Sequence, residues 1–114
     1  MIALKGVAPD MIANNLEPYR PTHPGEIIKD EIEYRGISQK KFADAINVSY
    51  SLLNEVLNGK RPLNTELALL IEKALDIPAE PLLKMQARYN MLVVKHNTDF
   101  LEKLKKVNKV ASVF

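Results

Sequence analysis

Residues 38–61, Ser-Gln-Lys-Lys-Phe-Ala-Asp-Ala-Ile-Asn-Val-Ser-Tyr-Ser-Leu-Leu-Asn-Glu-Val-Leu-Asn-Gly-Lys-Arg, decide the fold of this chain. Their apolar residues have helical spacing in two separate halves, and the break between the halves falls at Asn47. These apolar residues are Phe42, Ala43, Ile46, Val48, Leu53, Val56 and Leu57. The pattern predicts two short helices that are joined by a tight turn and share one small core.

Small and polar residues predict where these two helices begin and end. Ser38 and Ser49 each stand directly before a helical stretch, where a hydroxyl oxygen can accept a hydrogen bond from the free backbone N–H groups of the first turn. Asn47 tolerates the positive φ that so short a turn demands, and Ala43 is small enough to let the second helix cross close to the first. Gly59 then ends the second helix. The predicted unit is a helix-turn-helix.

The second of these helices carries the candidate DNA contacts at its leading end. In a DNA-reading helix-turn-helix this end enters the major groove. The candidates for contact with base edges are Tyr50, Ser51, Leu52 and Glu55. Leu52 is suited to touch a thymine methyl group, and Glu55 is suited to accept a hydrogen bond from the N4 amine of cytosine. The residues placed to contact phosphates are Gln39, Lys40, Asn58, Lys60 and Arg61.

The whole chain is predicted to divide into three parts. Residues 1–22 form an N-terminal arm, because prolines and an Asn-Asn pair interrupt any helical pattern there. Residues 23–94 form one helical domain, whose first helix starts at Pro24 and stops near Gly36. Residues 95–114 form a C-terminal amphipathic helix with an apolar seam. The seam consists of Phe100, Leu104, Val107, Ala111 and Phe114.

Two further helices complete the predicted domain. After Pro62, either Asn64 or Thr65 can cap a helix whose apolar stripe closes the bundle. The stripe consists of Leu67, Leu70, Ile71, Ala74 and Leu75. The next helix, after Pro78, has more apolar residues than a lone surface helix needs, and this surplus indicates a homodimer face. The candidate contacts on that face are Leu83, Tyr89, Met91 and Leu92.

Three stretches of the chain carry a resemblance to a known family. They are His-Pro-Gly-Glu-Ile-Ile from His23, residues 38–61, and Leu-Ala-Leu-Leu-Ile-Glu-Lys-Ala-Leu from Leu67. Together they resemble the Xre/Cro-repressor-like DNA-binding domain, and more closely the HigA-type antitoxins of toxin–antitoxin modules. The resemblance implies an all-α, five-helix lambda-repressor-like domain, with the arm and the extra C-terminal helix beside it. The chain departs from the family at Asn47, often a glycine, and at Glu55, often a basic residue.

By this resemblance, the chain is expected to be a homodimeric repressor that binds an operator in double-stranded DNA and represses its own operon. The resemblance also implies a partner, a small toxin ribonuclease of the HigB type, which the antitoxin neutralises by forming a complex. The residues themselves support only the DNA-binding part of this expectation. Two alternatives stay open: a stand-alone Xre-family repressor without a toxin, and a protein-interaction module that has lost DNA affinity. Glu55 is the main argument for the second alternative.

Composition narrows the class of protein and its surroundings. The 114 residues, 46% of them hydrophobic, fit one small globular domain with extensions. The lack of cysteine excludes disulfides and thiolate metal sites, and no signal peptide or long apolar run is present, so a cytoplasmic protein without a membrane span is expected. The net charge is only +2, but residues 38–62 hold four basic and two acidic side chains, and residues 95–114 hold five and two. Positive charge is therefore concentrated on the helix-turn-helix and on the tail.

No catalytic, cofactor or metal site is expected. His23 and His96 are the two histidines and lie far apart in the sequence, so they do not form a metal-ligand set, and His23 is interpreted as a residue that starts a helix. The acidic residues Asp30, Glu31 and Glu33 lie on a helix face opposite the apolar one, which is typical of a solvated surface. The four glycines are scattered at turns and form no phosphate-binding loop. The chain is therefore not expected to be an enzyme.

Overall fold

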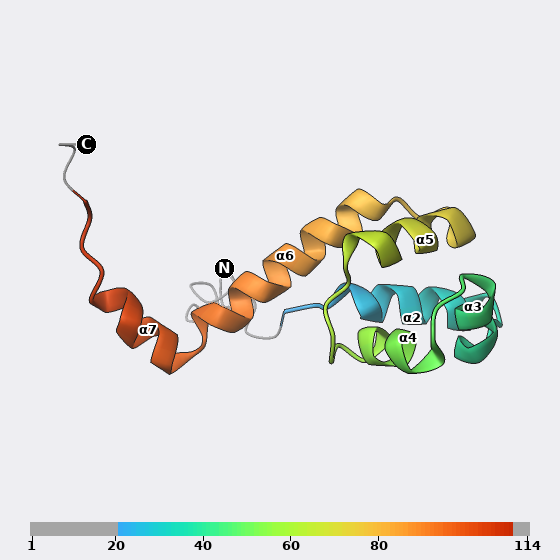
Figure 1. The fold of residues 1–114 in the computed structure, drawn as a ribbon, viewed down its shortest axis with the longest axis horizontal. Helices are drawn as coiled ribbons and strands as arrows, with labels where there is room; N and C mark the ends of the chain where they lie inside the picture. The colour runs from blue at the N-terminus through green and yellow to red at the C-terminus, as the bar shows by residue number, and fades with distance from the viewer. Residues whose placement is uncertain (1–20, 111–114) are drawn as a thin grey trace, which may run out of the picture.

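The computed structural model describes residues 21–110, and its regular structure is helical (Figure 1). Within this range six helices follow one another without a strand: α2 (Pro24–Tyr34), α3 (Gln39–Ala45), α4 (Tyr50–Leu57), α5 (Thr65–Leu75), α6 (Ala79–Lys95) and α7 (Thr98–Lys105). Helices α2 to α6 form the predicted five-helix domain and α7 is the extra C-terminal helix, so the predicted fold class is confirmed. Residues 1–20, which make up most of the predicted arm, lie outside the described residues.

Side chains cap the helices at the predicted positions. The hydroxyl oxygens of Ser38 and Ser49 each accept a hydrogen bond from the backbone N–H three residues further on, both at 3.1 Å. Asn64, rather than Thr65, caps α5, and its side-chain oxygen accepts from the backbone N–H of Leu67 at 2.8 Å. The boundaries of the helix-turn-helix are therefore fixed by short local hydrogen bonds.

The first three helices all end in a Schellman motif, in which two backbone N–H groups beyond the helix donate to carbonyls of its last turn. The residue in the turn has a positive φ, which is 72° at Gly36, 61° at Asn47 and 75° at Gly59. After α4, for example, the N–H of Lys60 donates to the carbonyl of Glu55 at 2.8 Å. The prediction that Asn47 adopts a positive φ is confirmed.

One core joins the helix-turn-helix to the other helices. Helix α3 packs on α4, α2 lies against α4 and α6, and α5 packs along α6 (Figure 1). The buried core residues are Ile28, Ile32, Phe42, Ala43, Ile46, Leu53, Val56, Leu57, Leu63, Leu67, Ala68, Ile71, Leu75, Ala79 and Leu82. Val48 is partly buried against this core. The orientation of α4 is therefore set by its contacts with both α2 and α3.

The predicted apolar stripe of α5 is wrong at two positions. Leu70 is 40% exposed and Ala74 is exposed, whereas Ala68 is fully buried. The buried face of α5 is thus centred on Ala68 and Ile71, because α6 packs along that side of the helix.

The C-terminal helix is shorter than the predicted residues 95–114. Helix α6 includes Lys95, α7 packs on α6, and α7 ends at Lys105. Val107, a predicted seam position, is 71% exposed beyond its end. A helix this short gains little from propagation, so it does not extend far without packing against another element. The last two predicted seam positions, Ala111 and Phe114, lie outside the described residues.

Candidate nucleic-acid interface

Helix α4 presents its capped N-terminal end to solvent. Tyr50 is 50% exposed and Ser51 is exposed, directly after the Ser49 cap. Leu52 is partly buried and packs against the core, so less of its side chain remains for a thymine methyl group. Of the predicted base contacts in this first turn, Tyr50 and Ser51 are the most accessible, and their role in reading bases stays a prediction.

The first residue of α3 is tied to the middle of α4. The side-chain nitrogen of Asn54 donates a hydrogen bond to Oε1 of Gln39 at 2.9 Å. This bond uses the Gln39 oxygen and leaves its amide nitrogen as a donor for an acceptor such as a phosphate oxygen. Lys40, the next residue of α3, is exposed. Asn54 therefore supports a predicted phosphate contact, and no local sequence pattern singled it out.

Two of the predicted DNA contacts bind each other. Oε1 of Glu55 accepts a hydrogen bond from Nε of Arg61 at 2.9 Å and forms an ion pair with its Nη2 at 2.7 Å. The pair lies on the surface, since 41% of the Glu55 side chain and 52% of the Arg61 side chain are exposed. Exposed ion pairs contribute only about 0.2–1 kcal/mol to stability, so the main effect of this one is on the position of the Arg61 side chain. Lys60 is exposed beside Arg61 in the chain.

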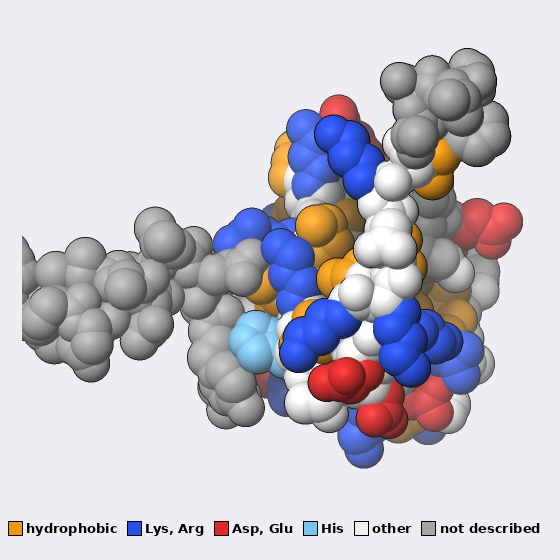
Figure 2. Space-filling model, turned by 90° about the vertical axis from the view of Figure 1, so that its left-hand side faces the viewer, with side chains coloured by type: hydrophobic (Ala, Val, Ile, Leu, Met, Phe, Trp, Pro, Cys, Tyr) orange, Lys and Arg blue, Asp and Glu red, His pale blue; other side chains and the backbone are white. Residues whose placement is uncertain are grey.

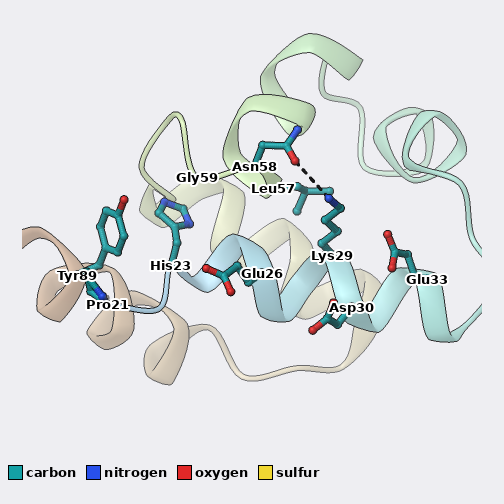
Figure 3. Close-up of a pocket in the computed structure, with 10 residues that line it drawn as sticks. All are labelled: Pro21, His23, Glu26, Lys29, Asp30, Glu33, Leu57, Asn58, Gly59 and Tyr89. Atoms are coloured by element: carbon teal, nitrogen blue, oxygen red, sulfur yellow. Dashed lines mark hydrogen bonds between the residues drawn. The ribbon is translucent and has the colours of Figure 1, made fainter. Parts of the chain in front are cut away.

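A residue of α2 holds the C-terminal end of α4. Nζ of Lys29 donates to Oδ1 of Asn58 at 3.3 Å (Figure 3). Lys29 was missed at the sequence level because it lies 29 positions before Asn58 and only the packing of α2 on α4 brings them together. The cleft beside this contact, of about 490 Å³, is also lined by the acidic residues Glu26, Asp30 and Glu33. These three side chains are exposed, as a solvated helix face requires.

His23 is buried where α2 begins and connects α2 with α6 and with the loop after α4. It is 2% exposed, its Nδ1 accepts from the backbone N–H of Gly25 at 2.9 Å, and its ring meets that of Tyr89 edge-on, with 4.8 Å between centroids (Figure 3). Burial lowers the pKa of His23 below its usual 6.5, against the opposing effects of a hydrogen bond with the Arg61 backbone and of nearby Glu26. The interpretation of His23 as a residue that starts a helix is confirmed. Through its hydrogen bond with the Arg61 backbone, the ring also contacts the loop that carries Arg61.

The basic side chains of the tail form a separate surface. Figure 2 looks onto the end of the molecule that lies on the left in Figure 1, and it shows Lys and Arg side chains around exposed hydrophobic ones. The exposed lysines of α7 and of the residues that follow it are Lys103, Lys105, Lys106 and Lys109. Helix α7 lies well apart from α3 and α4 (Figure 1), so these lysines do not extend the surface around α4.

The arrangement around α4 is that of a DNA-reading helix-turn-helix. Its N-terminal end is capped and accessible, and polar or basic side chains flank it on α3 and on the following loop. Gln39 and Arg61, which flank α4 along the chain, are both held by side chains of α4 itself. Such a surface places donors for phosphates on either side of a helix that enters the major groove.

Comparison with known proteins gives the same class. The helix-turn-helix family matches residues 28–82, which include all of α3 and α4. Virulence-associated protein I of Dichelobacter nodosus is 30% identical over 76 residues, which are 66% of this chain and 70% of that protein. Virulence-associated protein A' of Dichelobacter nodosus is 35% identical over 72 residues; the match covers 62% of this chain and spans only 63% of that relative's length. An addiction module antidote protein of the HigA family from Coxiella burnetii has a similar structure, with a TM-score of 0.69 and 25% identity over 80% of this chain and 99% of that one.

The chain belongs to the helix-turn-helix family. It has the fold of a transcriptional regulator, and this family consists of DNA-binding proteins rather than enzymes, in agreement with the sequence-based prediction. Among the described residues no helix is long and apolar enough to cross a membrane.

Proposed function

We propose that this chain binds an operator in double-stranded DNA as a transcriptional repressor and is the antitoxin of a HigBA-like module. The observation that supports DNA binding most directly is the accessible, capped end of α4 with Lys40 on α3 and Lys60 and Arg61 on the following loop. The structural likeness to the HigA-family antidote of Coxiella burnetii supports the antitoxin part. A regulator of this kind acts in the cytoplasm, where its operator is accessible.

Binding to phosphates has a direct test in the salt dependence of affinity. Fluorescence anisotropy of the full chain on a labelled duplex gives its affinity at several salt concentrations. For a dimer, the slope of log affinity against log salt concentration should be on the order of −5 to −8, because Lys and Arg side chains that bind phosphates release counterions from the DNA. Lys60→Ala should make this slope shallower by about one per protomer. Lys103→Ala, which removes the same charge on α7, serves as the matched control and should leave it unchanged. A slope near zero for the unaltered chain would contradict DNA binding.

A homodimer is proposed to form through α6, but not through most of the contacts predicted from the sequence. Leu92 is 2% exposed, Leu83 packs against the core and Tyr89 contacts His23, so Met91, at 58% exposure, is the most accessible of the four candidates. The exposed large apolar residues of α6 are Met91, Val93 and Val94. In a two-fold dimer on B-DNA the two α4 helices would stand about 34–36 Å apart.

Light scattering at micromolar concentration tests this dimer. Met91→Lys should shift the mass towards the monomer, because a charge would be buried in the apolar contact. Tyr34→Lys is the matched control, since Tyr34 is 88% exposed but lies on α2. A monomer in the unaltered chain, or an equal effect of both replacements, would contradict the proposal.

The antitoxin role and the stand-alone repressor differ in whether a toxin binds. We favour residues 1–18 as the toxin-binding segment, over residues 98–114; the first segment lies outside the described residues, so this stays a prediction. The experiment is to delete each segment and measure both operator binding and co-purification with a small toxin encoded beside this chain. Loss of toxin binding after the first deletion, with DNA binding intact, supports the proposal. Unchanged toxin binding would exclude this segment, and absence of any toxin partner would favour the stand-alone repressor.

A further inference from the structure

The ion pair between Glu55 and Arg61 connects the recognition helix to the loop that follows it. The two residues are brought together by the Schellman motif at the end of α4, where the N–H of Lys60 donates to the Glu55 carbonyl at 2.8 Å and Gly59 has a φ of 75°. The chain therefore turns back over the last turn of α4. As a result, the guanidinium of Arg61 reaches the Glu55 carboxylate, with nitrogen–oxygen distances of 2.9 and 2.7 Å.

This contact fixes the arginine without using all of its hydrogen-bond donors. A guanidinium has five N–H groups, and the carboxylate oxygen engages only Nε and Nη2 of Arg61. The two N–H groups of Nη1 remain for a second acceptor. More than half of the Arg61 side chain is exposed, so a phosphate oxygen can reach these groups while the pair with Glu55 stays closed.

We propose that Glu55 is a specificity-determining residue that acts through Arg61 and does not itself read a base, an inference that rests on the proposed DNA binding. On a duplex whose backbone lies at the right place, the fixed Arg61 donates to a phosphate. On any other duplex, Arg61 cannot follow the backbone without leaving Glu55, and the carboxylate then repels the phosphates that approach it. Glu55 thereby weakens binding to non-operator DNA more than binding to the operator.

The test compares two duplexes by anisotropy with the full chain. One is the duplex that the unaltered chain selects from a random-sequence library, and the other is poly(dI-dC). Glu55→Gln keeps the size of the side chain and removes its charge. It should raise affinity for poly(dI-dC) by about fivefold, which is the largest effect usual for one exposed charge pair. Affinity for the selected duplex should change by less than about twofold. The salt slope on poly(dI-dC) should steepen by about one per protomer.

Two further variants separate this mechanism from a general charge effect. In the Arg61→Ala background, Glu55→Gln should no longer change the ratio of the two affinities, because its route to specificity is gone. Glu80→Gln removes a carboxylate from another exposed ion pair, with Lys84 of α6 at 3.7 Å, and should leave the ratio unchanged. Thermal unfolding of each variant checks that the fold is intact.

The outcomes are distinguishable. An equal effect of Glu55→Gln on both duplexes would overturn the proposal. A change in the ratio that persists without Arg61 would also overturn it and would assign Glu55 to direct contact with a base. If the unaltered chain selects no duplex and shows no salt-dependent binding to poly(dI-dC), the proposed function fails as well, and that result differs from the other two.

Discussion

Gly25→Ala should destabilise the domain, because α2 passes too close to α4 to admit a methyl group. A Cβ atom at position 25 would lie 2.1 Å from the carbonyl oxygen of Val56, and 3.0 Å from both the Cα of Leu57 and Nδ1 of His23. Val56 and Leu57 belong to the last turn of α4, directly before the loop with the predicted phosphate contacts. The absence of a side chain at position 25 thus sets the distance between the two helices.

Two opposing effects determine the size of the change. Alanine favours a helix over glycine by about 0.8–1 kcal/mol in a helix interior, and by less in the first turn, where Gly25 lies. Against this, a carbon atom approaches a carbonyl oxygen to roughly 3.3 Å, so α2 and α4 would have to separate by about 1 Å. Overpacking that moves the backbone costs about 1–3 kcal/mol. Weakening of the hydrogen bond from the Gly25 N–H to His23 adds about 1 kcal/mol to this cost. The net loss should be about 2–3 kcal/mol, or roughly 10–20 °C in Tm.

Thermal and urea unfolding followed by circular dichroism measure this loss. Gly36→Asn is the matched control: a Cβ at position 36 meets nothing within 4 Å, and asparagine tolerates the φ of 72° found there. This control should lose less than about 1 kcal/mol. An unchanged or higher Tm for Gly25→Ala, or a loss no larger than that of the control, would refute the close approach of α2 to the α4 backbone.

Three further predictions concern His23, the cap of α4 and the predicted base contacts. Because burial lowers the pKa of His23, the unfolded chain binds more protons, so the free energy of unfolding should fall as pH drops below about 6.5. Urea titrations at several pH values in this range give the free energy of unfolding as a function of pH. This pH dependence should be weaker for His23→Gln, and an unchanged dependence would contradict the prediction. Ser49→Ala should cost about 1 kcal/mol in urea unfolding by removing the cap, whereas Ser51→Ala should not move the midpoint. Tyr50→Ala and Ser51→Ala should shift preference among operator variants by roughly 1–3 kcal/mol per lost contact, while Lys60→Ala should weaken all duplexes equally in competition anisotropy.

The features that the sequence predicted correctly are those fixed within a few residues. The Ser38 and Ser49 caps bond the backbone three positions away, and the turns at Asn47 and Gly59 depend on the φ of one residue. Each of these interactions has the same geometry in any helix with that sequence. The order and the approximate bounds of the five domain helices therefore follow from local chemistry alone.

The burial of individual side chains depends instead on how helices cross, which no local pattern contains. Leu70 and Leu92 both fit a helical apolar stripe, yet Leu70 is 40% exposed and Leu92 is 2% exposed. Tyr89, expected at a dimer face, packs on His23 because α2 begins beside α6. A sequence pattern gives the period of a helix face, and the neighbouring helices decide which part of that face is covered.

The hydrogen bonds of the candidate site also separate into residues that the sequence predicts and partners that only the packing of the helices brings near. The sequence identified Gln39 and Asn58 as donors for phosphates, but not the residues that hold them. Asn54 lies 15 positions from Gln39, and Lys29 lies 29 positions from Asn58. Both contacts follow from the packing of α3 and α2 on α4, so they are visible only in the folded chain.

The contact between Glu55 and Arg61 is different, because its cause is local and lies in the way α4 ends. In a Schellman motif the third residue from the helix end commonly makes an apolar contact with the residue after the turn. The first two motifs place apolar residues at these positions, Ile32 with Ile37 and Ala43 with Val48. The motif that ends α4 places Glu55 and Lys60 there, and Arg61 follows. Apolar side chains at these positions would anchor the turn to the core, whereas charged ones keep it in solvent with donors exposed. The same backbone turn that closes α2 and α3 onto the core therefore leaves the end of α4 open to an anionic partner.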